Sequence, residues 1–384
     1  MGKKKGNGEG LMVLTELNLV NFRNYKSLNI KFSDNINIIY GNNAQGKTNI
    51  LEGIYFLGVT KSHRSFIDEE LILKGEKQSK ILGNIKKNKF NSSFEITINN
   101  GKKKYKIDNN EIKKTSDYIS NINIIIFYPE DLEIIKGSPG IRRKFLNLEL
   151  SQLYNNYYRV LNDYNKLLKI RNEYLKKLQK NLIIDQNYFE IITEYLIEKA
   201  IFIYRARNKF INKINEYSND IFKEIMNLSN FKINYKTNFE FKEFNEIEIR
   251  KLLKSKYETE KNNEIRLGNT LYGPHRDDFE FTLDNNDLKS FGSQGQQRIA
   301  VLAIKLAEIE IFKNYSKTTP ILLLDDVFSE LDDQKKNNLL KYINSDIQTI
   351  ITTTDLENID KKIIDVSKIF KIENGNIVEI KEEV

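Results

Sequence analysis

The feature that most constrains the fold is an eight-residue glycine loop, GNNAQGKT, at residues 41–48. It follows a β-branched run at residues 35–40, and the pattern at residues 47–57 is typical of a helix. A strand, a glycine loop ending in Lys and Thr, and a helix form the phosphate-binding loop of many nucleotide-binding proteins. The order therefore predicts an α/β fold with a largely parallel sheet.

Each fixed position of this loop has a chemical reason. Gly41 and Gly46 allow backbone dihedral angles at which successive N–H groups face phosphates. Lys47 is expected to reach the terminal phosphates of ATP as a catalytic residue, and the Thr48 hydroxyl is expected to hold Mg²⁺. The predicted ATP-binding residues of the loop are Gly41, Asn42, Asn43, Ala44, Gln45, Gly46, Lys47 and Thr48.

A second segment, ILLLDD at residues 321–326, supplies the carboxylates that such a site needs. Its aliphatic run is typical of a strand buried on both faces. We expect Asp325, at the carboxyl end, to hold Mg²⁺, and Asp326 to polarise the attacking water as a catalytic residue. Taken alone, the same pattern is also typical of a strand followed by a solvated acidic turn.

A third segment, FGSQGQQR at residues 291–298, precedes a long amphipathic pattern at residues 296–315. A helix start with a Ser hydroxyl and unpaired N–H groups is a phosphate site. Because one nucleotide rarely needs two such cradles, Ser293, Gly295 and Gln296 are predicted to cap ATP bound by another subunit. The alternative is that Ser293 only caps the helix that follows it.

The middle of the chain has a different pattern, in which apolar residues recur at coiled-coil spacing and a polar break lies near Asp185. Two long helices with a short connection predict an antiparallel hairpin that forms an arm, and an ordinary helical bundle is the alternative. The two apolar runs are Leu146, Leu150, Leu153, Tyr157, Val160, Tyr164 and Leu167, then Leu196, Ala200, Ile203, Phe210, Ile214, Tyr217 and Ile221.

Composition limits the function classes. No apolar run is long enough to span a bilayer, and the absence of cysteine excludes disulfides and thiolate metal sites. The net charge of +8 fits a nucleic-acid partner, although the abundance of Lys, Asn and Ile also fits an AT-rich genome. Residues 1–11 are expected to be a disordered basic tail, with Met12 as a second candidate start.

The three segments, with further strings in the same order, resemble the RecF family of ABC/SMC-type ATPases. Among these strings, SELDD resembles the D-loop along the dimer seam of ABC ATPases. The strings are NFRNY (21–25), KSHR (61–64), YPEDLEIIKGSPGIRRKFLN (128–147), YGPHRDDF (272–279) and SELDD (329–333). Two features depart from transporter ATPases. Asp326 stands where those have Glu, and Thr354 or Asp355 must replace their switch histidine.

The resemblance implies an ABC/SMC-type P-loop head, split in sequence by an inserted helical arm. The expected parts are a head at residues 12–138, an arm at 139–260 and a head again at 261–384. It further implies a cytoplasmic, weak, DNA-stimulated ATPase that dimerises with ATP on gapped or junction DNA. Such a protein binds duplex and single-stranded DNA. It works with RecR- and RecO-like mediators in recombinase loading and the SOS response, with no membrane contact.

Three alternatives remain at this stage. An ABC ATPase subunit of another system, such as a transporter, is disfavoured by the missing switch histidine and by the helical insertion. A defence nuclease of the SMC type needs an additional acidic metal cluster. An ATP-binding scaffold without turnover is the third. His63 and His275, two isolated histidines in polar strings, are expected to serve folding or the seam, and Lys61 and Arg64 are candidates for phosphate contact.

Overall fold

The computed structural model describes residues 10–65, 67–226, 230–239, 244–316, 318–330, 336, 339 and 346–381. The chain divides into two compact units. The first comprises residues 1–131 and 302–384, and the second residues 132–301. The predicted tail at residues 1–9 and the last three residues of SELDD, at 331–333, lie outside the described residues.

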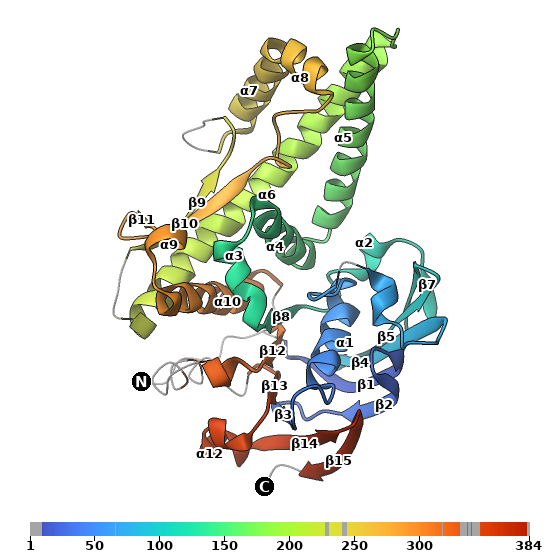
Figure 1. The fold of residues 1–384 in the computed structure, drawn as a ribbon, viewed down its shortest axis with the longest axis vertical. Helices are drawn as coiled ribbons and strands as arrows, with labels where there is room; N and C mark the ends of the chain where they lie inside the picture. The colour runs from blue at the N-terminus through green and yellow to red at the C-terminus, as the bar shows by residue number, and fades with distance from the viewer. Residues whose placement is uncertain are drawn as a thin grey trace. The chain divides into compact units, whose positions relative to one another are not determined.

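A six-stranded, largely parallel sheet forms the centre of the first unit (Figure 1). Its inner strands are short and fully buried, as the aliphatic runs predict, and β15 joins the edge antiparallel to β14. The strand order is β15 (Asn376–Lys381), β14 (Ser367–Glu373), β3 (Ile36–Tyr40), β13 (Thr349–Thr353), β12 (Ile321–Asp325) and β8 (Ile124–Phe127).

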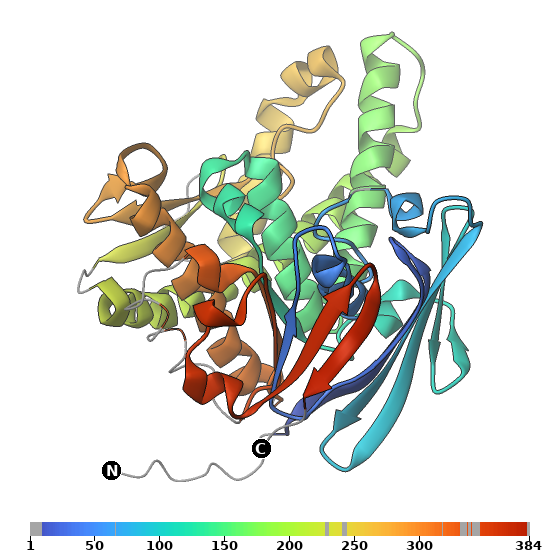
Figure 2. The ribbon, with the colours of Figure 1, turned by 60° about the horizontal axis from the view of Figure 1, so that its bottom comes forward.

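An antiparallel sheet completes the first unit, and helix α1 (Lys47–Val59) contacts strands of both sheets. Gly83 allows the close approach, because a Cβ atom there would lie 2.4 Å from a Leu57 methyl group. The order of this sheet is β2 (Tyr25–Lys31), β1 (Met12–Phe22), β4 (Gln78–Lys87), β5 (Phe90–Asn99), β6 (Lys102–Ile107) and β7 (Asn110–Ile112), drawn in blue to cyan in Figure 2.

Short helices connect these strands. They are η1 (Asp68–Leu71), α2 (Thr115–Tyr118), η2 (Pro129–Leu132), η3 (Val327–Glu330), η4 (Leu356–Asn358) and α12 (Lys361–Ile364).

The disordered tail predicted at residues 1–11 extends too far, because Gly10 and Leu11 are part of the folded structure. Gly10 is buried and forms a parallel bridge with Thr318, and its carbonyl oxygen accepts a hydrogen bond from the Thr319 N–H at 3.1 Å. The Leu11 carbonyl oxygen accepts a hydrogen bond from Asn88. Because these backbone groups are paired, the packed chain begins before Met12.

The second unit is mainly helical, and the predicted hairpin is formed by α5 and α6, which pack side by side. The first apolar run is two helices instead of one, because the chain turns between Tyr154 and Tyr157. The helices are α3 (Glu133–Lys136), α4 (Pro139–Leu153), α5 (Tyr157–Gln179), α6 (Gln186–Met226), α7 (Glu246–Thr259), α8 (Lys261–Leu267) and α9 (Leu288–Phe291).

A three-stranded sheet extends the second unit beyond the residues expected for the arm. Strand β10 (Asp278–Leu283) pairs with both β9 (Phe231–Lys236) and β11 (Asn286–Asp287). This pairing ties residues that were expected in the head to the arm helices, so the unit runs to Val301 and not to residue 260. Helix α10 (Gln294–Ser316) begins in the second unit and ends in the first.

Buried charges of the second unit are paired within it. Arg171 donates to Glu264 at 2.7 Å and to Thr270 at 2.7 Å, and its guanidinium lies 4.2 Å from the centre of the Tyr257 ring. His275, from the GPHRDD string, lies 2.6 Å from the Tyr164 hydroxyl. The string therefore contributes to the arm core. Within the described residues, no helix is both long and apolar enough to cross a membrane.

Candidate nucleotide site

The phosphate loop connects β3 to α1, as predicted, and its backbone requires glycine at two positions. Gly41 has a φ of 151° and Gly46 a φ of 110°. A Cβ atom would lie 2.3 Å from the Ile372 carbonyl oxygen at the first, and 2.6 Å from the Tyr25 hydroxyl at the second. Neither position can therefore take a larger residue without moving its surroundings.

Lys47 is almost fully buried beneath this loop, at 7 % exposure. Its ammonium donates hydrogen bonds to the carbonyl oxygens of Gly41 at 2.5 Å and Asn42 at 2.9 Å. Burial lowers the pKa of Lys47, whereas the charges of Asp326 and Asp325 act to raise it. A buried cation whose hydrogen-bond partners are neutral carbonyl groups fits an anionic ligand.

Thr48 and Asp325, the two predicted Mg²⁺ ligands, lie together. The Thr48 hydroxyl donates to Asp325 Oδ1 at 3.0 Å, and the Thr352 hydroxyl donates to the same oxygen at 2.6 Å. Burial raises the pKa of Asp325, although these hydrogen bonds and the charge of Arg64 oppose the shift. A nearby cation stabilises the charged form of a carboxylate that burial has destabilised. The oxygen atoms of Thr48 and Asp325 therefore fit Mg²⁺.

Asp326 follows directly and has a left-handed backbone, with a φ of 53°. Its N–H donates to both the carbonyl and the hydroxyl oxygen of Thr352, each at 3.2 Å. Its charge acts on Lys47, which lies close by. A non-glycine residue in this conformation is uncommon, and aspartate is among the residues that adopt it most readily.

A buried carboxylate that the sequence did not reveal anchors the strings NFRNY and KSHR beside the loop. Glu52 on α1 is fully buried and accepts two hydrogen bonds from Arg23, at 2.7 and 2.8 Å, and one from Ser62 at 2.5 Å. Burial acts to raise the pKa of Glu52, but these hydrogen bonds outweigh it and hold the pKa below its usual value. The apolar positions around Glu52 gave no signal of this role.

Arg64, a candidate for phosphate contact, lies next to the loop. Its guanidinium donates to Asn49 Oδ1 at 2.9 Å, and Asn49 in turn donates to Asn24 at 2.8 Å. The carbonyl oxygen of Gln45 accepts a hydrogen bond from the Gly375 N–H at 3.2 Å. The outer side of the loop is thus braced, while Asn42, Asn43 and Ala44 are exposed.

The residues expected to act on a second nucleotide belong to the other unit. The Ser293 hydroxyl accepts a hydrogen bond from the Gln296 N–H at 3.2 Å, and Gln296 Oε1 accepts one from the Ser293 N–H at 2.8 Å. This reciprocal pair is a capping box, so the helix-capping role of Ser293 is present. Gly295 is partly exposed, and a Cβ atom there would make only an ordinary contact, 3.9 Å from the Ser293 hydroxyl oxygen.

The candidates for the switch residue follow β13. Thr353 donates through its hydroxyl to the Asp355 carbonyl oxygen at 2.8 Å. The Asp355 carboxylate caps η4 by accepting from the Glu357 N–H at 3.0 Å. Thr354 is partly exposed, so its hydroxyl is accessible to a ligand.

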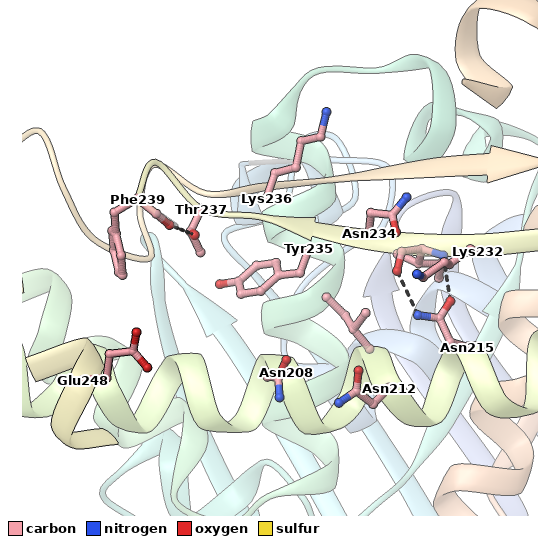
Figure 3. A pocket seen from close by; sticks show the side chains of 12 residues that line it. Asn208, Asn212, Asn215, Lys232, Asn234, Tyr235, Lys236, Thr237, Phe239 and Glu248 are labelled. Carbon is pink, nitrogen blue, oxygen red and sulfur yellow. Dashed lines mark hydrogen bonds between the residues drawn. The ribbon is translucent and has the colours of Figure 1, made fainter. Parts of the chain in front are cut away.

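A cavity of about 870 Å³ lies in the second unit, between α6, β9 and the start of α7 (Figure 3). Asn215 bonds both backbone groups of Ile233, at 2.7 and 2.8 Å, and so pairs α6 with the outer edge of β9. Asn208 and Asn212 line the cavity from the same helix. None of the predicted site residues lines this cavity.

Comparison with known proteins agrees with this geometry. Residues 13–378 match the family model described as the RecF/RecN/SMC N terminal domain. The "DNA replication and repair protein RecF" of Geobacillus sp. (strain WCH70) is 43% identical over 370 residues, covering 95% of this chain and 98% of that protein. The protein of that name from Latilactobacillus sakei subsp. sakei (strain 23K) is 39% identical over 375 residues, covering 97% and 100%.

Solved structures give the same result. The structure described as "the recombination mediator protein RecF-ATP in RecFOR pathway" superposes with a TM-score of 0.90 at 34% identity, covering 99% of this chain and 100% of that one. An Smc head domain from Pyrococcus furiosus has a TM-score of 0.54 at 16% identity, covering 97% and 96%, and supports the fold alone. The chain belongs to the RecF family of ABC/SMC-type ATPases.

Proposed function

We propose that this chain is an ATP-dependent DNA-binding mediator of DNA repair and recombination, with weak, DNA-stimulated ATPase activity. The observation that carries the proposal is the joint arrangement of Lys47, Thr48 and Asp325 at the end of the parallel sheet. Family membership supports it, because a relative described as a recombination mediator was solved with ATP.

Within one subunit, the backbone amides of residues 41–48 and Lys47 bind the phosphates of ATP. Thr48 and Asp325 would hold Mg²⁺, which would supply neutralisation of the phosphate charge. Asp326 orients the attacking water, and Lys47 offsets the charge that develops on the leaving phosphate oxygens.

Between subunits, Ser293, Gly295 and Gln296 act on the nucleotide of a second copy. Two-fold symmetry lets each copy offer its α10 start to the other, so ATP becomes part of the seam. In the single chain the Ser293 N–H donates a hydrogen bond to Gln296 Oε1. A phosphate oxygen that accepts from the same N–H would have to replace Gln296 Oε1. We therefore expect the Gln296 side chain to move when the dimer closes.

The ATP-bound dimer binds DNA, favouring duplex DNA and single-strand/duplex junctions such as those at gaps, and also contacts single strands. It works with RecR- and RecO-like proteins to load recombinase and supports the SOS response, in the cytoplasm. The net charge of +8 supports an electrostatic contribution to DNA binding.

Sedimentation velocity with and without Mg·ATP, repeated with a short gapped duplex, tests the proposal. We expect a monomer alone, a dimer with ATP and a larger complex with DNA. ATP binding without turnover, dimerisation or DNA binding would instead identify an ATP-binding scaffold. Dependence on a membrane subunit would identify an ABC ATPase of another system.

A further inference from the structure

The hairpin of β4 and β5 ends in the most exposed aromatic ring that the structure describes. Phe90 is 79 % exposed, and it stands directly opposite Lys87 in the register of the two strands. Asn88 and Lys89 form the two-residue turn between them, and the φ of Asn88 is 57°, as tight hairpin turns require.

The exposure of Phe90 follows from its place in the strand. Side chains of one strand alternate between the faces of a sheet, so Phe90 shares its face with Phe94 and Ile96. Those two are buried, at 5 % and 0 %, whereas Phe90 lies beyond the part of the face that other elements cover. Strand β6 pairs with β5 only from Phe94 onward, so it does not reach the tip either.

The tip is nevertheless held in place. Strand β1 pairs with β4 up to the contact of Met12 with Lys87, and the Asn88 N–H donates to the Leu11 carbonyl oxygen at 3.3 Å. Gly10 packs so closely on Asn88 that a Cβ atom would lie 2.1 Å from its side-chain oxygen. An exposed ring on a braced turn loses little conformational freedom when it binds, because its support is already ordered.

Two lysines lie next to the ring. Lys86 is paired with Asp34, at 2.7 Å, but Lys87, directly opposite Phe90, and Lys89, in the turn, form no ion pair within the described residues. An exposed aromatic ring with two such lysines is suited to a base flanked by phosphates, since stacking and phosphate contact together bind single strands.

We propose that this tip, Lys87 to Asn91, binds an unpaired base next to a duplex end, with Phe90 stacked on the base and Lys87 and Lys89 on the flanking phosphates. Inside a duplex both faces of a base are covered by neighbours, so the ring needs a single strand or the end of a helix. The inference rests on the proposed DNA-binding function, and it assigns the recognition of single-strand/duplex junctions to this surface.

The absence of tryptophan from the sequence makes a direct test possible. Phe90→Trp carries a single tryptophan at the tip, and Val378→Trp, at a 51 % exposed site on β15, is the matched control. With Mg·ATP present, gapped DNA should quench the fluorescence of Phe90→Trp and leave that of Val378→Trp nearly unchanged. In parallel, labelled DNA measures affinity by fluorescence anisotropy.

Phe90→Ala and Phe90→Leu should each weaken binding to gapped or single-stranded DNA by about fivefold to tenfold, because one stacked base is lost. Binding to a long blunt duplex should change less than twofold. If the wild type binds gapped DNA but neither variant weakens it and no quenching occurs, the tip inference is wrong and the proposed function stands.

Two further outcomes overturn the proposal. If the wild type binds no DNA with ATP present, the proposed function fails and the tip inference fails with it. If vesicles with anionic lipids, and not DNA, change the fluorescence of Phe90→Trp, the tip is a membrane contact instead.

Discussion

One buried cation in each unit shows two different ways in which buried charge is compensated. In the arm, Arg171 and Glu264 are 1 % and 0 % exposed and bond each other, and Thr270 and Tyr257 complete the surroundings of the guanidinium. In the head, Lys47 bonds neutral carbonyl groups, and burial raises the pKa of Asp325. Burial alone therefore does not mark a functional site, and Lys47 is set apart by its neutral partners in the phosphate loop.

The largest effect is expected where the arm pairing is broken. Arg171→Leu leaves the Glu264 carboxylate buried without its cation, so the free energy of unfolding should fall by about 3–5 kcal/mol. Arg205→Leu is the matched control, because its pair with Glu246 is half-exposed and contributes less than about 1 kcal/mol. Urea denaturation measures both variants, and equal losses would remove the distinction between the two kinds of pair.

In the head, the corresponding change should affect turnover and not folding. Lys47→Arg replaces a compact ammonium with a planar guanidinium, so ATP turnover should fall about 10²- to 10³-fold, as for loss of one transition-state contact. Lys113→Arg, at an exposed position, should hydrolyse ATP normally. Near-normal turnover in Lys47→Arg would show that the buried cation does not serve the reaction.

Glu52 is intermediate between Arg171 and Lys47. Like Arg171 it forms a buried ion pair, with Arg23, but like Lys47 it lies beside the phosphate loop. Glu52→Gln weakens the charged hydrogen bonds to Arg23 and Ser62 and should cost about 1.5–3 kcal/mol of stability. Glu76→Gln, at an exposed carboxylate, should cost almost nothing. Thermal unfolding without nucleotide compares them, and equal midpoints would contradict a bracing role for Glu52.

The last effect concerns pH. Burial lowers the pKa of His275 to about 4, from an ordinary value near 6.5. At that residue the unfolded chain binds a proton more readily than the folded protein does. Its contribution to stability is therefore present above pH 6.5 and is lost as pH falls toward 4. Unfolding midpoints of the wild type and His275→Asn between pH 7 and pH 4.5 should converge as pH falls, and parallel curves would contradict this.

The contrast also explains how much the sequence could predict. GNNAQGKT and ILLLDD predicted the parallel sheet and the joint position of Thr48 and Asp325. Each motif is a short continuous segment, and the carboxyl ends of parallel strands lie at the same edge of a sheet. The ion pair of Arg23 with Glu52 could not be predicted, since a pair between segments far apart in the sequence leaves no local pattern. The residues at 261–301 join the arm for the same reason, through the pairing of β9 with β10.

The central claim is that ATP joins two copies of the chain through Ser293, and light scattering with Mg·ATP tests it most directly. Ser293→Arg places a bulky cation at the start of α10 and leaves residues 41–48 untouched. It should bind ATP, stay monomeric and not hydrolyse it. Asp326→Asn should form an ATP-bound dimer that turns over poorly. If Ser293→Arg still dimerises with ATP, or the wild type is equally dimeric without it, the claim is wrong.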